Sequence, residues 1–370
     1  MAQRDRETHT VSDTGWRRRF NETVAFGNRI DYQASVMDFV DPQDCKPFNR
    51  TMREHKGGRI NKSGTGNLSA IFSNYLADRY RTDIDSGQLS SNITFTDDLG
   101  DVVYATRAAA RTNPSRPYVD VPVNVLQLGE ITSLIRKRGD SIIKEAAKEN
   151  LRYQFAIKPL VGDLIKLCDF QDQVENRIKE LERLRGVRGL RRTIPLGGLA
   201  ELSKTTSGSE DVQTAGGLSI FANPYTQLST CQVGAHVRWK PAVNLSGYSP
   251  GDMRRIARRA VLGLTADLST LWEVVPWSWL IDWSSSIGSY LAAHRNIIPA
   301  DLVGVYITRL TRSTRTWNAR SGSGWTLTSF VTSVETKKRS DAVTIAPVAH
   351  FPFLSGNQMG ILASLYVTRA

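Results

Sequence analysis

Most of the N-terminal third of the chain has the residue pattern of β-strands. In residues 16–40 apolar and polar positions alternate in pieces, and aromatic and β-branched side chains are frequent. Residues 92–106 predict a hairpin with a central turn of Asp, Leu and Gly. The polar residues 1–15 predict a flexible arm. Residues 46–62, with many basic side chains and paired glycines, predict an exposed loop.

The middle of the chain changes to apolar positions three and four residues apart, which indicates helices. One segment covers residues 131–142, and a second runs from about residue 144 to residue 153. Pro159 marks a boundary or a first helical turn. The apolar residues that follow it predict one long amphipathic helix, which ends near Gly186 or Gly189.

Strands resume in the second half of the chain and are followed by another helix. Residues 197–217, rich in Gly, Ser and Thr, predict a loop or a hairpin tip, and residues 218–243 predict strands. A helix then begins at Ser249, which is suited to cap it. Pro250 fits the first turn, and Asp252 lies near the positive end of the helix dipole.

Apolar stripes continue through the next block. The helix after Ser249 is expected to bury one face, formed by Ile256, Ala260, Leu264 and Leu268. A last helix is expected after Pro276, with one stripe formed by Leu280, Trp283, Ile287 and Leu291. The C-terminal part predicts strands at residues 303–317 and 325–334, around a Ser-Gly turn, and a short helix at residues 357–367.

These blocks predict an α+β fold, because strands and helices are segregated rather than alternating as βαβ units. The chain of 370 residues is long enough for two domains or for one large elongated one. We expect a mainly β region with a flexible arm, a helical region, a β region, a second helical region, and a β region with a short helix. Their bounds are residues 1–125, 126–192, 193–248, 249–296 and 297–370.

The composition adds a class of partner to this picture. Hydrophobic residues make up 40% of the chain, which is enough for a buried core, and the formal net charge is +12. An excess of positive charge favours a polyanionic partner such as nucleic acid, or an acidic surface. A basic protein that is merely soluble is the alternative.

Cysteine usage and hydropathy exclude other classes. Cys45, Cys168 and Cys231 form no CxxC pair, so a zinc ribbon is excluded, and their odd number argues against a disulfide framework. No apolar run is long enough for a membrane-spanning helix, and the N-terminus has no apolar signal-peptide core. We therefore expect the protein to be made and assembled in a reducing cytoplasm.

Phosphate-binding motifs are incomplete. Gly64-Thr65-Gly66 is not followed by the third glycine of a dinucleotide-binding loop. In residues 57–63, Asn61 occupies the place of the P-loop glycine that lets the backbone wrap a phosphate. Neither stretch is taken as a nucleotide site.

Catalytic groups are also sparse. The five histidines are scattered over the chain, so no metal site is expected. Glu273 and Asp282 could form an acid–base pair, but helix capping and ion pairs to a neighbouring helix explain them more simply. The sequence therefore predicts a protein that is no enzyme and needs no cofactor or metal.

Three basic clusters in the predicted helical blocks are candidate contacts for RNA or DNA. Arginine suits phosphate because its planar guanidinium group binds two oxygens at once. The clusters are Arg136, Lys137 and Arg138; Arg177, Lys179, Arg185, Arg188, Arg191 and Arg192; and Arg254, Arg255, Arg258 and Arg259. The last four form two i,i+4 pairs, whose like charges repel unless an anion lies against them. A solvated helix face with Glu180 and Glu182 as partners is the alternative.

The stretch Leu271–Trp283, LWEVVPWSWLIDW, contains four of the eight tryptophans. On its own it indicates packing, because aromatic side chains bury the most area per residue. A helix at a membrane interface is the rival interpretation. That would need basic residues on the polar face, which carries serines instead.

This stretch also resembles a motif of a known family. Trp272, Glu273, Pro276, Ser278, Asp282 and Trp283 match the pattern W/Y-E-x-x-P-x-S/T-x-x-x-D-W. Residues 149–164, which include Lys158 and Pro159, match a second pattern, Y-x-F-x-x-K/R-P-L-x-x-D. Both patterns, with the one at residues 149–164 preceding the one at residues 272–283, are similar to those of the maturation (A) proteins of single-stranded RNA bacteriophages of the levivirus type.

The resemblance implies a virion protein that is made in the cytoplasm of a bacterial host. One copy would replace a coat-protein dimer in the shell. A helical bundle region would face inward and hold genomic RNA, and a long twisted antiparallel β-sheet would project outward and attach the particle to a host pilus. The protein would then accompany the RNA into the cell. In this interpretation the tryptophans lock the helices together.

Two other classes stay open. A cellular RNA-binding or ribosome-associated structural protein would share the basic helices and leave the two motifs as coincidence. A nuclease or nucleotidyltransferase would need clustered carboxylates for a metal, and Asp83 and Asp85 form only an isolated pair in a polar segment.

Overall fold

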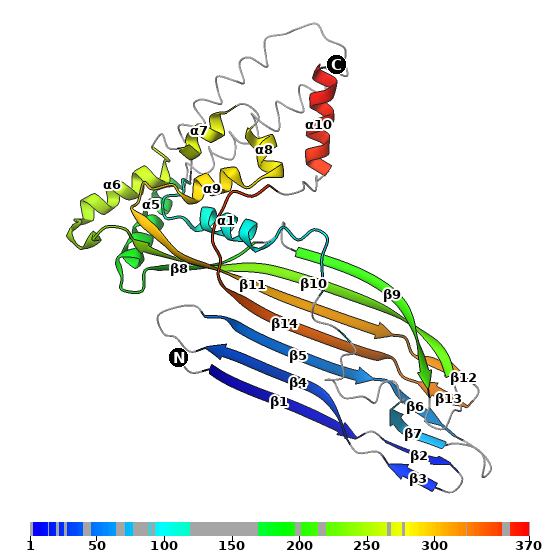
Figure 1. Ribbon diagram of the computed structural model, residues 1–370. Helices are drawn as coiled ribbons and strands as arrows, with labels where there is room; N and C mark the ends of the chain where they lie inside the picture. Colours follow the sequence, from blue (N-terminus) through cyan, green and yellow to red (C-terminus); the bar gives the residue numbers. More distant parts are fainter. Residues whose placement is uncertain are drawn as a thin grey trace. The chain divides into compact units, whose positions relative to one another are not determined.

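The structure is a computed structural model of the chain (Figure 1). The residues that it describes are 3–13, 15–19, 22–25, 28–39, 46–63, 71–76, 89, 93–118, 169–196, 201–213, 220–264, 268–275, 278–322, 324–349 and 356–369. They form both strands and helices, and the α+β prediction is confirmed.

Two compact units make up the chain. The strand unit consists of Met1–Asp98, Pro195–Gly234 and Thr308–Asp341, and the helical unit consists of Leu99–Ile194, Ala235–Ile307 and Ala342–Ala370. Every described α-helix belongs to the helical unit. Each unit is therefore assembled from segments that lie far apart in the sequence.

The described strands form two sheets. The strands are β1 (Gln3–Asp13), β2 (Trp16–Arg19), β3 (Glu22–Ala25), β4 (Asn28–Phe39), β5 (Phe48–Gly57), β6 (Arg59–Lys62), β7 (Ile71–Leu76), β8 (Leu190–Pro195), β9 (Glu201–Gln213), β10 (Ile220–Pro241), β11 (Ala300–Trp317), β12 (Arg320–Gly322), β13 (Trp325–Leu327) and β14 (Phe330–Ala342). The larger sheet has 8 strands in the order β1-β4-β5-β14-β11-β10-β8, with β9 also paired to β10. The smaller has 6 strands in the order β12-β13-β6-β7-β2-β3.

Alternating burial explains why β10 is a strand. Cys231, Val233, Ala235, Val237 and Trp239 are buried, and the residues between them are more exposed. Successive side chains of a strand point to opposite faces, so this period of two places one row in the core. The predicted strands at residues 218–243 are confirmed.

Three polar segments that were expected to be loops or arms are strands, and those predictions were wrong. Residues 1–15 contain β1, which pairs with β4 from Gln3 to Asp13. Residues 46–62 contain β5 and β6, and β5 lies between β4 and β14. Residues 197–217 contain β9, whose described side chains are mostly exposed. Each pairs through its backbone while showing polar side chains, so the hydrophobic pattern gave no signal.

The paired glycines near residue 57 mark the step from one sheet to the other. Gly57 and Gly58 have φ of 79° and 76°, a left-handed conformation that disfavours other residues. A Cβ at Gly57 would also collide with the carbonyl of Ser329. Glycine is therefore required where β5 of the larger sheet ends and β6 of the smaller sheet begins.

The helical unit contains several short helices and some longer ones. The helices are α1 (Asp101–Thr112), α5 (Phe170–Arg185), α6 (Pro250–Val261), α7 (Leu268–Val274), α8 (Ser278–Ser284), α9 (Ile287–Ala293) and α10 (Gly356–Arg369), with a 3₁₀ turn at Leu245–Gly247. The ends predicted for α5 and α10 are confirmed within a few residues.

The predicted hairpin at residues 92–106 was wrong, because its second half is α1. The turn predicted before Gly100 is followed by a helix instead of a strand. Gly100 has a φ of 84° and precedes the first residue of α1. The alanines beyond residue 106 favour a helix, and Val103, Tyr104 and Ala105 are buried on it. The β-branched residues at the start of α1 are typical of strands, and they led to the wrong prediction of a hairpin.

Two predicted apolar stripes were also wrong. α6 ends at Val261, and Leu264 and Leu268 beyond it are exposed. The helix expected after Pro276 is two helices, α8 and α9, so Leu280, Trp283, Ile287 and Leu291 form no single stripe. Between them, the Ser286 amide donates to the Val348 carbonyl at 2.9 Å, and the Val348 amide donates to Ser286 Oγ at 2.9 Å.

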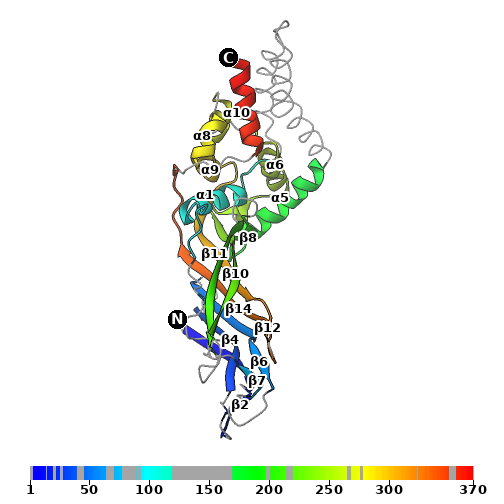
Figure 2. The same ribbon diagram turned by 90° about the vertical axis from the view of Figure 1, so that its right-hand side faces the viewer.

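Asn113 fixes the end of α1 against the end of α9, which lies beside it (Figure 1 and Figure 2). Its Nδ2 donates to the carbonyls of Ala292, Ala293 and Arg295 at 3.1, 2.9 and 2.9 Å. Its Oδ1 accepts from the Ser115 amide at 2.7 Å. The last carbonyls of a helix lack intrahelical partners, so one buried amide satisfies groups that burial would otherwise leave unpaired.

We expect Asn113→Ala to lower the free energy of unfolding by about 2–4 kcal/mol, because it leaves several buried polar groups without their hydrogen-bond partner. Chemical denaturation followed by circular dichroism measures this. Asn296→Ala, at an exposed position just after α9, is the matched control and should change little. Equal effects of the two substitutions would contradict the role given to Asn113.

Candidate nucleic-acid interface

α6 begins where its sequence predicted. The Ser249 side chain accepts from the Asp252 amide at 3.2 Å, and the Asp252 carboxylate accepts from the Ser249 amide at 3.2 Å. This reciprocal capping box, with Pro250 at the first position, defines the start of the helix. The hydrogen bonds to Ser249 lower the pKa of Asp252, which stays charged at the positive end of the helix dipole.

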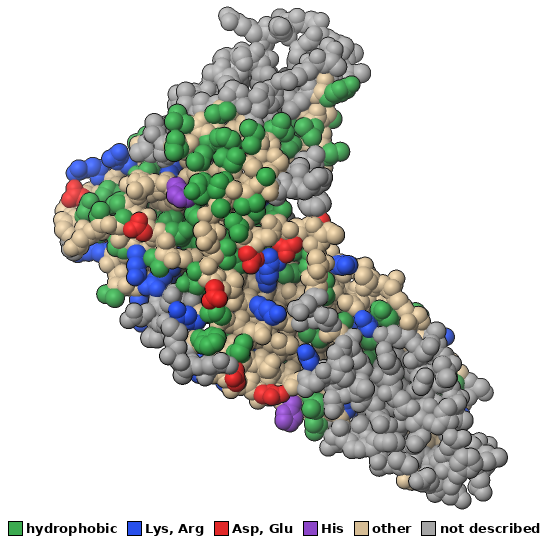
Figure 3. Space-filling view, in the orientation of Figure 1, with side chains coloured by type: hydrophobic (Ala, Val, Ile, Leu, Met, Phe, Trp, Pro, Cys, Tyr) green, Lys and Arg blue, Asp and Glu red, His purple; other side chains and the backbone are tan. Residues whose placement is uncertain are grey.

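The apolar and basic residues of α6 lie on different faces. Met253, Ala257, Ala260 and Val261 are buried, and α6 packs against α5. The four arginines are exposed and form what we call the α6 arginine face: Arg254, Arg255, Arg258 and Arg259. Figure 3 shows Lys and Arg side chains gathered over α6. The sequence placed these residues on one helix, and the structure brings them together on its surface.

Most of this charge has no counter-charge among the described residues. Arg255 pairs with Asp252 at 3.3 Å in an exposed position, which contributes little to stability. Within the described part of the chain, no carboxylate forms an ion pair with Arg254, Arg258 or Arg259. The negative end of the helix dipole favours the last two, but it does not relieve the repulsion between successive turns.

The second predicted cluster is divided by the structure. Arg177 is buried, and its Nη1 donates to the Pro114 carbonyl at 2.7 Å and to Glu180 at 2.8 Å. Its Nη2 donates to the Arg116 carbonyl at 2.8 Å. Arg192 also pairs with Glu180. The prediction that Arg177 contacts nucleic acid is therefore corrected, because its guanidinium group is bound inside the protein. Arg192 is half-buried, and its guanidinium group is already paired with Glu180.

The remaining basic residues of that cluster lie on a surface of mixed sign. Lys179 and Arg185 are exposed on α5, Arg188 is exposed in the turn after it, and Arg191 is exposed on β8. Exposed acids of α5 lie among them, at Asp172, Glu175 and Glu182. The net charge of +5 from Arg177 to Arg192 thus overstates what a polyanion would meet on this helix.

Glu180 is the centre of a charge cluster that consists of Arg116, Arg177, Glu180 and Arg192. Arg116 lies 3.3 Å from its carboxylate. Burial raises the pKa of Glu180, but the charges of Arg177, Arg116 and Arg192 outweigh burial and hold that pKa below its usual range. Burial, followed by the charge of Arg116, lowers the pKa of Arg177 to about 10, so it stays protonated at neutral pH.

The tryptophan motif joins three short helices. Trp272 on α7 donates from Nε1 to Asp282 Oδ2 on α8 at 3.1 Å. The Gly288 amide, in the first turn of α9, donates to Asp282 Oδ1 at 2.9 Å. A Cβ at Gly288 would collide with this carboxylate, so glycine permits the approach. Asp282 therefore caps α9 and holds Trp272, as the capping interpretation expects, and both of its oxygens are bound.

Several predicted residues lie outside the described part of the chain. Arg136, Lys137, Arg138, Lys158, Pro159 and Pro276 are among them, as is the side chain of Glu273. The predictions for these residues stay predictions.

The sequence also missed residues that shape the interface. Asn113 and Arg116 were missed because they lie in a stretch that was expected to be β. The ion pair between Arg177 and Glu180 had a signal in the sequence, because the two residues are three positions apart on one helix. Tyr248 gave no signal, because a lone aromatic residue before a cap is common. It lines a cavity between α5 and α6.

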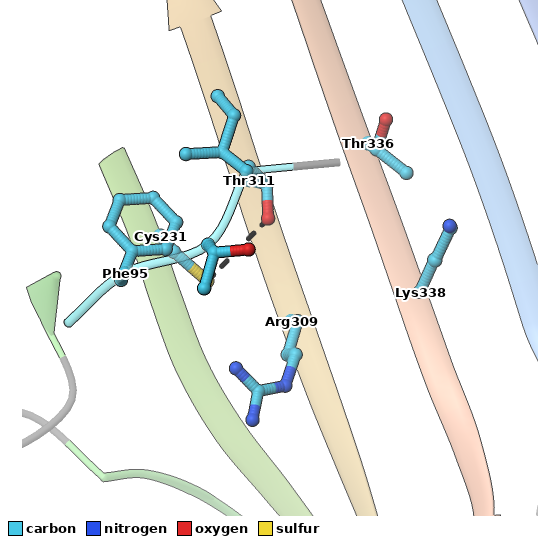
Figure 4. Close-up of a pocket in the computed structure, with 8 residues that line it drawn as sticks. Phe95, Cys231, Arg309, Thr311, Thr336 and Lys338 are labelled. Carbon is cyan, nitrogen blue, oxygen red and sulfur yellow. Dashed lines mark hydrogen bonds between the residues drawn. The ribbon is translucent and has the colours of Figure 1, made fainter. Parts of the chain in front are cut away.

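A second cavity lies on one face of the larger sheet, in the strand unit (Figure 4), and has a volume of about 310 Å³. The buried Cys231 thiol accepts a hydrogen bond from the Thr311 hydroxyl at 3.5 Å. Arg309 forms a bidentate ion pair with the Asp98 carboxylate, with hydrogen bonds of 2.6 and 3.2 Å. The described lining contains no histidine to activate the thiol, so this cavity shows no nucleophile–base pair.

The described part of the chain holds no group of three or more His, Cys, Asp or Glu side chains that could bind a metal ion. None of its helices combines the length and the hydropathy needed to cross a membrane.

We expect Glu180→Gln to lower the free energy of unfolding by about 3–5 kcal/mol at pH 7, because three guanidinium groups would be left without their shared counter-charge. The pH dependence should change as well. A carboxylate with a lowered folded pKa contributes stability above its unfolded pKa of about 4.3, and the contribution disappears as pH falls through the folded value.

Denaturation from pH 7 down to pH 3 measures both effects. The decline of stability below about pH 4.3 should be shallower in Glu180→Gln than in the unmodified protein. Glu175→Gln, at an exposed position on the same helix, is the matched control. A decline of the same steepness in both variants would show that Glu180 carries no such role.

Comparison of the sequence with protein-family models and with curated proteins gives no match. The strongest feature of the interface is the α6 arginine face, which a capping box positions and which α5 supports from behind.

Proposed function

We propose that this protein binds single-stranded genomic RNA inside a bacteriophage particle, as a maturation and attachment protein. The observation that carries the RNA-binding part is the α6 arginine face, where four exposed guanidinium groups lie on successive turns of one helix. The observation that favours the virion is the pair of sequence motifs, of which Trp272 and Asp282 are in contact at 3.1 Å.

The chemistry of α6 suits a phosphate backbone. Guanidinium groups bind phosphate oxygens bidentately and stay charged at all physiological pH values. Phosphates laid along the face would remove the repulsion between the i,i+4 pairs and release counterions from the RNA. Recognition of this kind follows backbone shape and charge, and it needs no standard RNA-binding module.

The rest of the proposal follows from the resemblance. One copy replaces a coat-protein dimer in the shell, and an elongated molecule presents a helical bundle region to the RNA and a long twisted antiparallel sheet to the host pilus. The protein is made in the bacterial cytoplasm, enters the cell with the RNA, and acts as no enzyme. The polar strands β9 and β12, which each pair with a single described strand, supply candidate surfaces for the pilus, because polar segments at the margin of a sheet are open to a partner.

A cellular RNA-binding or ribosome-associated protein is the second candidate, and the α6 arginine face favours it equally. Its binding site would be the same, but its location would differ. A nuclease would cut RNA and a nucleotidyltransferase would extend it from nucleoside triphosphates. RNA of unchanged length after incubation with the protein, divalent cations and nucleoside triphosphates would remove that class.

The location can be measured on purified particles. We expect quantitative mass spectrometry to find one copy of the protein per particle, with the coat protein as internal standard. Particles assembled without it should package RNA poorly and fail to adsorb to piliated cells. Recovery of the protein with ribosomes of uninfected cells, and its absence from particles, would favour the second candidate.

The RNA contact can be measured through its salt dependence. Replacing Arg254, Arg255, Arg258 and Arg259 together with glutamine should weaken RNA binding strongly at low salt and much less at high salt. Each phosphate that the variant no longer neutralises should flatten the log–log slope by about one unit. Glutamine is a good helix former, so circular dichroism should be unchanged.

A matched control separates a local effect of α6 from an effect of net charge. Replacing Lys56, Lys204, Lys337 and Lys338 with glutamine removes the same number of exposed charges from the strand unit. This control should keep most of the salt slope. If both quadruple variants reduce the slope equally, α6 has no special role and RNA binds diffusely over the surface.

A further inference from the structure

We propose that the cavity between α5 and α6 binds one unstacked base of the RNA, with guanine preferred. This inference rests on the proposed function and gives it a sequence preference. The cavity has a volume of about 340 Å³, at the small end of the range for ligand pockets, about 300–1,000 Å³. Its size suits a single nucleotide better than a folded RNA element.

The cavity combines an apolar wall with polar groups from two helices. Ile178 and Met253 supply apolar surface, and Tyr248 supplies an aromatic ring that is half-buried. Single-stranded RNA is recognised when its unpaired bases stack on such rings and use their edges for hydrogen bonds. Among the described residues that line the cavity, Tyr248 has the one aromatic ring, so it supplies the stacking surface.

Arg254 belongs both to this cavity and to the α6 arginine face. A phosphate bound by the arginine face would therefore lie next to the cavity, and the base attached to that phosphate would be within reach of Tyr248. This placement distinguishes the cavity from an ordinary surface hollow, because binding of the RNA backbone delivers the base to it.

Glu182 and Arg185 decide which base fits best. They lie one helical turn apart on α5 and line the same cavity. A carboxylate accepts two hydrogen bonds from adjacent N–H donors, and a guanidinium group donates to carbonyl and ring-nitrogen acceptors. The Watson–Crick edge of guanine presents two adjacent N–H donors beside a carbonyl oxygen. Uracil presents one donor between two carbonyls, which the carboxylate repels.

Gly251 leaves the first turn of α6 open beside the cavity. A Cβ at this position would meet only Ser249 Oγ, at 3.7 Å, which is an ordinary van der Waals distance. The Cβ of a Gly251→Leu variant therefore meets no backbone clash, and the rest of the side chain adds apolar bulk at the cavity. It provides a blocking variant that leaves all charges in place.

The experiment measures binding of short RNAs by fluorescence anisotropy at several salt concentrations. The probes are short oligouridylates in which the central position is uracil, guanine, adenine or abasic. We expect the guanine probe to bind about tenfold more tightly than the uracil probe. The abasic probe should bind weakest, with the salt slope equal for all four.

Four variants assign the preference to the cavity. Tyr248→Ala should weaken the base-containing probes at least about fivefold, and Tyr248→Phe should not, because the ring is retained. Glu182→Gln should reduce the preference for guanine over uracil without changing the salt slope. Gly251→Leu should make all four probes equal. Circular dichroism of each variant checks that the helices are intact.

The outcomes separate this inference from the proposed function. If the unmodified protein binds all four probes equally, with a steep salt slope, the base cavity is wrong and the arginine face stands. If the guanine preference persists in both Tyr248→Ala and Gly251→Leu, the base is read elsewhere and the assignment fails. If no probe binds at low salt, the proposed RNA interface itself is wrong.

Discussion

The helical unit depends on one carboxylate. Glu180 forms ion pairs with Arg116, Arg177 and Arg192, which come from the turn after α1, from α5 itself and from β8. Arg177 also binds two carbonyls in that turn, so the same group of charges fixes α5 to α1 and to β8. Since α6 packs on α5, the arrangement of the whole candidate interface follows from this cluster. Charges that are partly buried in this way need their partners, because an unpaired guanidinium group inside a protein is costly.

This cluster also shows why counting arginines in a sequence overestimates a binding surface. Arg177 and Arg258 are the same residue type on helices that touch each other, but one is buried among carbonyls and the other faces solvent. The difference arises from the faces that the helices bury. α5 turns one of its arginines inward with the apolar residues Val174 and Leu181, whereas α6 buries only small and apolar residues. An arginine therefore becomes a candidate for phosphate binding only after the buried face of its helix is known.

Local signals allowed parts of this fold to be predicted, and interactions distant in sequence decided the rest. The capping residues Ser249, Pro250 and Asp252 placed the start of α6, because a helix end depends on neighbours in the chain. The strand β10 was predicted from its sequence because its buried residues alternate along the chain, which is also a local pattern. β9 and β1 were missed because their side chains are mostly polar and their pairing is made by the backbone. The break between α8 and α9 is accompanied by hydrogen bonds to Val348, and no neighbouring residue announces it. The base cavity needs Tyr248 and Glu182, far apart in the sequence, on two packed elements.

The polar character of β1 bears on how copies of this protein behave toward one another. β1 is an edge strand of the larger sheet, and one side of its backbone has no neighbour among the described strands. Its exposed side chains include Arg4, Asp5, Arg6 and Glu7. Such an edge is a template for the strand of another chain, and closely spaced charges make that pairing unfavourable. The same charged residues that hide β1 from sequence analysis therefore also disfavour edge-to-edge pairing between two copies of the chain.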